Sequence, residues 1–369
     1  MTPTASTASP DLATAVQNAV DVMSVPKLAD ADSFVLHAPL ELIARVGLLD
    51  QVDPVRRDDA ISMIEWLTAQ YAAAGDPVTA PPPVAIDDPA AAAARLAGAL
   101  RAGEVDEVDA IAAALLPLVS PPEAAGLLGE AVVTSLSAAG HAPIGFFLLG
   151  RVRPVLSPAL LRGALRTIAM RPDWQVDWQR HFVGQGEPHQ LYDAVRRTPH
   201  LGSPGSDFIY PLMSQVQRRG VTAEMLGPVL ADRFDTAAAA RLLNRTAAWS
   251  MLHDEPGHAP YGWTHALTMP QAVMALAGAG VLPRTALAVA GTYTMGFRAA
   301  HGSVELPATI EPGDDPDVSW TEVATAAALH EDAHLVKFTL ACRFAADDDP
   351  RFERLYRAAA AYLVEWWGA

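Results

Sequence analysis

Residues 321–349 read TEVATAAALHEDAHLVKFTLACRFAADDD, and this stretch gives the clearest indication of the fold. Its alanines and leucines recur at intervals of three and four residues, which is the period of an amphipathic α-helix. The Ser-Trp-Thr-Glu sequence at residues 319–322 has the spacing of a capping box and predicts the start of the helix. We therefore expect one long helix, on which His330, His334 and Lys337 project from the same apolar face.

Alanine-rich segments with the same period make up most of the rest of the chain. Alternating β-branched residues, which would indicate strands, are scarce. The proline-rich stretch 75–89 predicts an extended surface connection, and residues 1–12 predict a disordered tail. We therefore expect an all-α protein, a large helical bundle that forms a single domain over residues 13–369. The clearest further helical segments are PAAAAARLAGALRAG (89–103), VDEVDAIAAALLPLV (105–119), ALLRGALRTIAM (159–170) and TAAAARLLNRTAAWSML (236–252).

The composition narrows the classes of partner and compartment. A formal net charge of -16 would repel phosphate backbones, which argues against nucleic acid as a partner. Cys342 is the single cysteine, so no intrachain disulfide is possible and a reducing compartment is favoured. No stretch is long and charge-free enough to span a bilayer. These features predict a soluble cytoplasmic protein, a monomer or a homodimer, with AYLVEWWGA (361–369) as a packed helix end or a dimer contact.

The tripeptide HAP occurs three times, at His37, His141 and His258. His37, His141 and His265 lie in strongly apolar helical segments, where an imidazole without a partner would cost roughly a few kcal/mol. Helix bundles often build metal sites from one inward histidine on each of several helices. A buried lysine such as Lys337 would repel a cation in that site unless it were neutral or modified. The pattern predicts a metal site between helices.

Four patches of the chain together resemble the questin oxidases, a family of fungal and bacterial proteins of aromatic polyketide metabolism. LHAPLELIARVGLL (36–49) is similar to the family's His-x-Pro-(Met/Leu) segment, and GHAPIGFFLLGRV (140–152) to its second histidine helix. WTHALTMPQAV (263–273) resembles its His-Ala-(Val/Leu)-Thr patch. HEDAHLVKFTLAC (330–342) resembles its (Asp/Glu)-x-His-(Val/Leu)-(Ile/Val)-Lys-Phe-Thr signature and is the most specific of the four. The patches follow the family's order.

The resemblance implies a non-haem iron centre held by four histidines and an N-carboxylated lysine. Carried onto this chain, it implies as ligands His37, His141, His265, His334 and carboxylated Lys337. His258 stays open as an alternative third ligand, although the following ALT favours His265. Carboxylation by CO2 requires a neutral amine and converts a repelled cation into an anionic oxygen ligand. At six-coordination these five ligands leave Fe(II) one open position for dioxygen.

The activity that the resemblance implies is that of an Fe(II)-dependent oxygenase. It would use O2 for oxygen insertion or ring cleavage on a small aromatic substrate, an anthraquinone-like polyketide. We interpret His330 and Lys337 as catalytic, although the family signature requires no histidine at the position of His330, which leaves open whether it supports a ligand, faces the substrate or has no role. The candidates for the wall of an aromatic-substrate pocket, with core packing as the alternative, are Trp263, Met269, Phe146 and Phe147.

Two other interpretations of the sequence remain. One is a zinc hydrolase with a carboxylated lysine, and the other is a non-catalytic helical binding protein whose histidines are satisfied by hydrogen bonds. No flavin, nicotinamide or P-loop motif is present, so an oxygenase would take its electrons from the substrate or from outside. The histidines that we expect at the surface or in loops are His181, His189, His200, His253 and His301.

Overall fold

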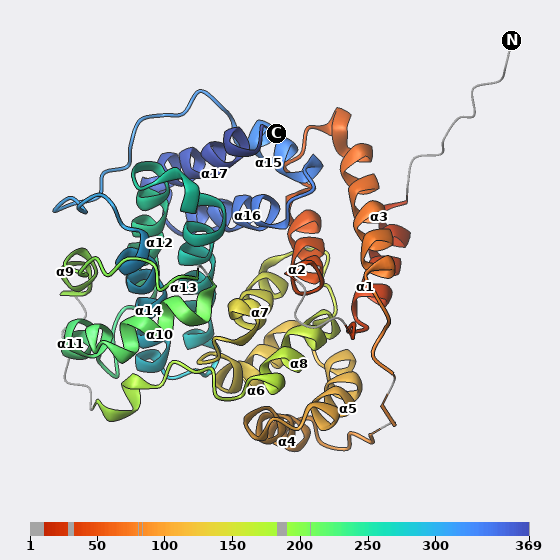
Figure 1. Ribbon diagram of the computed structural model, residues 1–369. Coiled ribbons are helices and arrows are strands. Elements are labelled where there is room, and N and C mark those ends of the chain that lie inside the picture. The colour runs from red at the N-terminus through yellow and green to blue at the C-terminus, as the bar shows by residue number, and fades with distance from the viewer. Residues whose placement is uncertain are drawn as a thin grey trace, which may run out of the picture.

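Helices are the regular elements of this chain, as the computed structural model shows (Figure 1). The structure describes residues 11–28, 33–79, 81–82, 84–182, 190–206 and 208–368. Within these ranges the extended pairing consists of two isolated β-bridges, Lys27 with Pro77 and Ser135 with Gln175. The prediction of an all-α fold is confirmed.

Eight helices belong to the first half of the described chain and nine to the second. The first eight are α1 (Leu12–Met23), α2 (Ser33–Leu48), α3 (Arg57–Ala73), α4 (Pro89–Ala102), α5 (Val105–Leu115), α6 (Pro121–Val132), α7 (His141–Arg151) and α8 (Arg162–Met170). The other nine are α9 (Leu191–Arg196), α10 (Ile209–Arg218), α11 (Val221–Leu226), α12 (Thr236–His253), α13 (Thr264–Leu276), α14 (Pro283–His301), α15 (Trp320–Leu329), α16 (Ala333–Asp348) and α17 (Glu353–Trp367).

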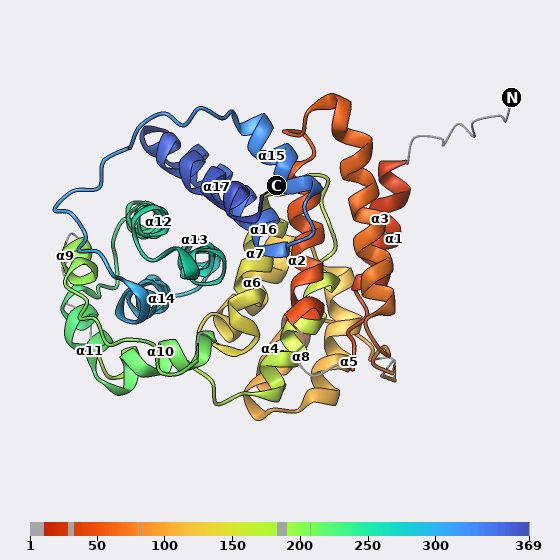
Figure 2. The ribbon, with the colours of Figure 1, turned by 45° about the horizontal axis from the view of Figure 1, so that its top comes forward.

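Four helices occupy the centre, where the two halves of the chain meet. Figures 1 and 2 show α1 to α8 on one side of the molecule and α9 to α14 on the other, with α15 to α17 across the top. Helix α2 packs against α7 and α16, and α13 packs against the same two helices. These contacts close a ring of four helices that are far apart in the sequence. Side chains directed into this ring come from both halves.

The histidine-rich stretch that we predicted as one helix is two. Helix α15 ends before His330, and α16 begins after Asp332, whose carboxylate accepts a hydrogen bond from the backbone N–H of His334 (2.7 Å). The Nδ1 atom of His330 accepts one from the backbone N–H of Asp332 (3.0 Å). These side chains satisfy N–H groups that an unbroken helix would bond internally, so the helix restarts here. The prediction of a continuous helix was wrong, and His330 does not share a helical face with His334.

The predicted connection and tail lie as follows. Between α3 and α4 the described residues form no helix until Pro89, which opens α4 behind the N-cap Asp88. The backbone N–H of Val78 donates to the carbonyl of Pro26 (2.8 Å), which fixes this extended connection along the chain that leaves α1. The predicted tail, residues 1–12, lies outside the described residues up to residue 10, and residue 12 already belongs to α1.

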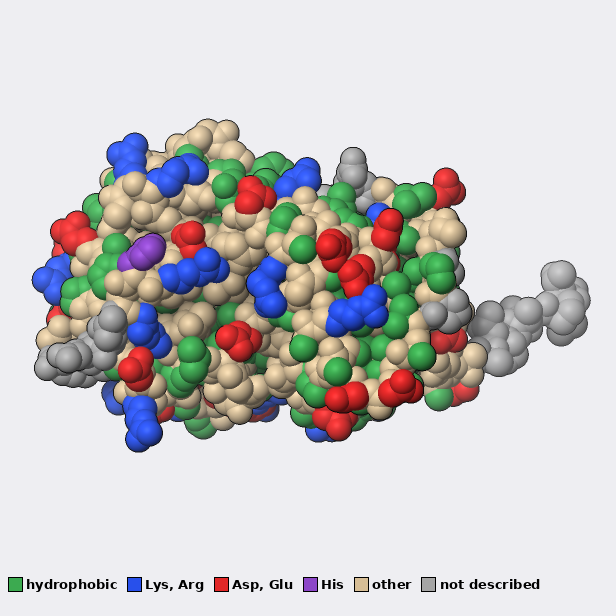
Figure 3. Space-filling view, turned by 90° about the horizontal axis from the view of Figure 1, so that it is seen from below, with side chains coloured by type: hydrophobic (Ala, Val, Ile, Leu, Met, Phe, Trp, Pro, Cys, Tyr) green, Lys and Arg blue, Asp and Glu red, His purple; other side chains and the backbone are tan. Residues whose placement is uncertain are grey.

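The core and the surface differ sharply in composition. Cys342 is fully buried, and α13 and α14 are buried along most of their length. Acidic and basic side chains are interspersed on the face that Figure 3 shows. Within the described ranges no helix combines the length and the hydropathy needed to cross a bilayer. The polar side chains that lie inside this core therefore require an explanation.

Candidate metal centre

Each helix of the central ring contributes one histidine to a common cluster. The four are His37 on α2, His141 on α7, His265 on α13 and His334 on α16. The ring centroid of His37 lies 4.3 Å from that of His141 and 4.4 Å from that of His334. The centroid of His265 lies 5.5 Å from that of His334 and 5.9 Å from that of His141. The structure thus brings together the four histidines that the resemblance implies as ligands.

Three of these imidazoles already stand close to metal-binding geometry. His37, His265 and His334 each offer a ring nitrogen, and these atoms lie within 4.8 Å of one another. Nitrogens that share an ion at about 2.1 Å lie up to roughly 4 Å apart, so small ring rotations would complete the set. His141 joins through its edge contact with His37.

A strained turn just before α7 positions His141 in the cluster. Ala138, Ala139 and Gly140 have φ values of 52°, 49° and 74°, in the left-handed region that L-residues with a Cβ rarely adopt. A Cβ on Gly140 would lie 2.5 Å from the Sδ atom of Met269 on α13. Glycine is therefore required at this point, where the chain turns sharply and starts α7 with His141.

Helix α13 is preceded by one turn of π-helix, Ala259–Trp263, which orients His265. The carbonyl of Tyr261 accepts a hydrogen bond from Nδ1 of His265 (2.7 Å), so the proton of the neutral ring resides on Nδ1. This leaves the Nε2 atom of His265 with a free lone pair in the interior. Turns of π-helix occur frequently at functional sites.

His334 is oriented by the N-terminal cap of its own helix. Oδ1 of Asp332 lies 3.2 Å from Nδ1 of His334 and 2.7 Å from its backbone nitrogen. A carboxylate on Nδ1 again places the proton there and leaves Nε2 available as a ligand. Two of the four imidazoles thus have the tautomer that binds metal through Nε2.

The electrostatics of the cluster favour neutral imidazoles. Burial lowers the pKa of His141 and His265 well below its ordinary value, and the nearby charge of Lys337 and of other histidines lowers it further. Burial also lowers the pKa of His334, although Asp332 opposes the change. Neutral imidazoles are the form that ligates metals, so these rings are ready to bind one at neutral pH.

Lys337 lies one turn after His334 and shares the interior with the histidines. Burial lowers the pKa of its amine to about 7, against the raising influence of Glu41 and Asp332. The neutral amine is therefore accessible near physiological pH. A neutral amine is the form that reacts with CO2 to give a carbamate.

A buried ion pair, which we did not predict from the sequence, lies on α2, the helix that carries His37. Nε of Arg45 donates to the carboxylate of Glu41 at 2.8 Å, and both side chains are almost fully buried. The same guanidinium donates to the carbonyls of Ala328 and His330, so it ties α2 to the break between α15 and α16. His37, Glu41 and Arg45 follow one another at four-residue intervals, and this spacing on one helical face was the available signal.

The buried polar atoms of the cluster test whether a metal fits. Among the described residues, neither ring nitrogen of His141 has a hydrogen-bond partner, and Nε2 of His265 has none. Buried polar atoms without partners are rare, because they lose their hydrogen bonds to water and gain none in the protein. A cation between the four rings would accept the lone pairs of Nε2 of His265 and of one ring nitrogen of His141, and the donor set of imidazole nitrogens suits iron and zinc. The residues present fit a metal.

Several predicted residues lie apart from the cluster. His258 belongs to a short 3-10 turn and its ring stacks on that of His301 at 3.7 Å, which favours His265 as the fourth imidazole of the group. His301 is buried at the end of α14, so the prediction of a surface position was wrong for it. The ring of His330 lies 5.8 Å from that of Trp367, on the far side of the helix break. The exposed histidines are His181, His200 and His253, as predicted, and His189 lies outside the described residues.

The predicted substrate-binding residues have different surroundings. Trp263 is buried against Phe297, and Phe147 packs edge-on against Phe344. Phe146 is also buried in the core. These contacts are those of core packing, the alternative that the sequence left open. Met269 alone adjoins the cluster, through its contact with the turn that precedes His141.

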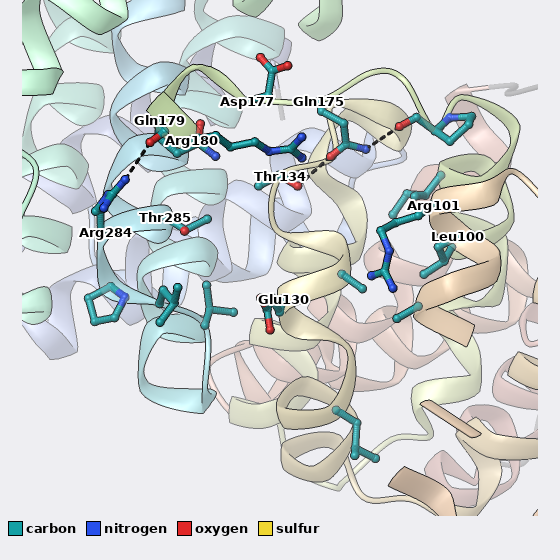
Figure 4. A pocket seen from close by; sticks show the side chains of 18 of the residues that line it. Leu100, Arg101, Glu130, Thr134, Gln175, Asp177, Gln179, Arg180, Arg284 and Thr285 are labelled. Atoms are coloured by element: carbon teal, nitrogen blue, oxygen red, sulfur yellow. Dashed lines mark hydrogen bonds between the residues drawn. The ribbon is translucent and has the colours of Figure 1, made fainter. Parts of the chain in front are cut away.

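A wide cleft of about 980 Å³ lies elsewhere, between α4, α6, the loop 172–180 and the start of α14. Figure 4 shows that Arg101, Arg180 and Arg284 line it together with Glu130. None of its lining residues belongs to the four central helices. Size alone would make this cleft the default binding site, but the perturbed and unpartnered groups lie at the histidines. We therefore place the candidate site in the central ring.

Comparison of the chain with protein-family models, with curated proteins and with solved structures gave no significant match. The resemblance to the questin oxidases therefore rests on the four sequence patches, and the geometry of the cluster is the independent observation beside it.

Proposed function

We propose that the chain is a non-haem Fe(II) oxygenase, similar to the questin oxidases, that acts on a planar aromatic substrate. The observation that carries the proposal is the convergence of four histidines, three of them buried, from four separate helices. They lie near buried Lys337, whose pKa is about 7. Neutral imidazoles beside a neutral amine form a set of donors, whereas a structural core would place apolar side chains there.

The ligands in this proposal are His37, His141, His265, His334 and carboxylated Lys337. The neutral amine of Lys337 adds to the carbon of CO2, a C–N bond forms, one C–O π bond becomes a carboxylate, and a proton leaves to solvent. Bound Fe(II) supplies the one-electron chemistry with dioxygen that side chains lack. The carbamate adds a negative charge, which offsets that of the cation and removes the repulsion of an ammonium.

The chain's own groups position and protect the site. The carbonyl of Tyr261 and the carboxylate of Asp332 hold the protons of His265 and His334 on Nδ1, and so aim both Nε2 atoms inward. Glu41 and Arg45 anchor α2 to the helix break beside Asp332. The apolar helices around the cluster exclude bulk water, which keeps the amine neutral.

One observation also favours a zinc hydrolase. Three imidazole nitrogens within 4.8 Å of one another match the three protein ligands that catalytic zinc sites use. The two functions differ in metal and in oxygen dependence, so metal analysis separates them.

Elemental analysis of protein purified without oxygen tests the proposal, with His334→Ala prepared in parallel. We expect close to one iron per chain in the wild type and almost none in the variant. We then expect the iron protein to consume dioxygen when a hydroxylated anthraquinone or its reduced form is added. Stoichiometric zinc with no oxygen uptake would replace the oxygenase by the hydrolase. No metal in the wild type after reconstitution with Fe(II) and bicarbonate would refute both.

A further inference from the structure

Tyr261 has an unusual position for a tyrosine, because it contacts the buried cluster and also reaches solvent. Its carbonyl bonds His265, and its ring meets that of His334 edge-on with centroids 4.9 Å apart. The residue is nevertheless 55% exposed. The aromatic residues that the sequence suggested for this role, Trp263 and Phe147, are buried in the core.

The four histidines differ in exposure, and Tyr261 lies beside the most exposed of them. His37, His141 and His265 are buried, whereas His334 is partly exposed. A molecule that approaches from solvent therefore meets His334 first, and the ring of Tyr261 stands beside it. The π-helical turn Ala259–Trp263 places Tyr261 here while Trp263, two residues later, turns into the core.

The second side chain beside His334 is that of Asp332. The carboxylate of Asp332 contacts His334 from the opposite end of the ring and is about a quarter exposed. A fixed negative charge repels anionic ligands and accepts hydrogen bonds from hydroxyl groups. An exposed aromatic ring, that of Tyr261, and a hydrogen-bond acceptor, the carboxylate of Asp332, thus both lie beside His334.

We infer that Tyr261 is the platform on which the planar aromatic substrate stacks as it approaches the metal. Offset stacking on a tyrosine ring contributes beyond the area that it buries, and it requires no change in the ring's position. This inference rests on the proposed function for the identity of the reaction, but the stacking itself can be measured without turnover.

Anaerobic binding of an uncharged dihydroxyanthraquinone, followed by absorbance, tests the platform. Tyr261→Ala should raise the Kd about tenfold, whereas Tyr261→Phe, which keeps the ring, should stay within about threefold of the wild type. Phe208→Ala is the matched control, because Phe208 is an aromatic residue that is 80% exposed. It lies at the start of α10, which is not one of the four central helices. Iron content is measured in each variant and should not change.

The outcomes separate this inference from the proposed function. An unchanged Kd in Tyr261→Ala, or no binding of the probe to the wild type, would refute the role of Tyr261 as a stacking platform. The iron content, which tests the proposed function, would not be affected by that result. A Tyr261→Phe variant as weak as Tyr261→Ala would assign the effect to the hydroxyl and overturn stacking. A wild-type protein that holds no iron would refute the oxygenase but would leave the binding result intact.

Discussion

The sequence GHAP occurs at residues 140–143 and again at residues 257–260, with opposite outcomes. At the first, a left-handed glycine turns the chain so that His141 enters the ring of four helices. At the second, His258 lies in a short 3-10 turn and stacks on His301, outside that ring. The same four residues therefore produce a candidate ligand in one place and a stacked pair in the other. The partners that the fold places opposite an imidazole decide its chemistry.

The largest expected difference between the two regions is in metal binding. His265→Ala should reduce the affinity for Fe(II) at least about a hundredfold, because it removes a ligand, whereas His258→Ala should leave the affinity unchanged. Both histidines belong to the same turn-and-helix segment, so the pair controls for local unfolding. Metal titration after removal of endogenous metal measures both. Equal losses would show that the comparison between the two GHAP regions is wrong.

Each region also has a buried ion pair, and these pairs sharpen the comparison. Arg45 bonds Glu41 beside the cluster, and Arg298 bonds Asp254 beside the stacked histidines. Arg45→Met and Arg298→Met should each lower the free energy of unfolding by about 3–5 kcal/mol, since each removes the cation that neutralises a buried carboxylate. Only Arg45→Met should also weaken metal binding, by roughly tenfold or more. Urea denaturation and metal titration report the two effects, and weaker metal binding in Arg298→Met would contradict the separation.

The glycines that begin the two motifs should respond differently to alanine. Gly140→Ala places a Cβ at φ 74° and against Met269, so we expect a loss of about 2–4 kcal/mol in unfolding free energy and weaker metal binding. Gly257 has open space at the Cβ position, and Gly257→Ala should change stability by less than about 1 kcal/mol. Thermal unfolding measures both. A tolerated Gly140→Ala would show that the left-handed turn is not needed to place His141.

The smallest expected effect, taken per pH unit, is the pH dependence that Lys337 gives to the metal-free protein. Its pKa is about 7 in the fold and near 10.5 in an unfolded chain, so between these values the unfolded state binds the extra proton. The free energy of unfolding should therefore rise with pH across this window, by up to about 1.4 kcal/mol per pH unit. Lys337→Met should remove that slope in CO2-free buffer. Identical pH profiles for the variant and the wild type would refute a buried, unpaired amine.

Much of the fold could be predicted because helical signals are local. Alanine and leucine periodicity, the Ser319–Glu322 capping box and the proline-rich connection all act within a few residues, and the structure has each of them. The helix break at residues 330–332 escaped prediction because its cause is a competition between side-chain and backbone hydrogen bonds. Composition and period do not reveal which of the two prevails.

The sequence by itself determined the helices and placed His37, His141 and His265 in apolar surroundings, because burial follows from the hydrophobic pattern along each helix. The full set of four histidines and a lysine came from the resemblance to a family. The tertiary structure alone decided that α2, α7, α13 and α16 close into a ring, that His258 lies outside it, and that Glu41 and Arg45 support it. It also decided that Tyr261 is exposed and contacts His334, whereas Trp263 is buried. These outcomes depend on contacts between segments up to about three hundred residues apart, which local periodicity does not encode.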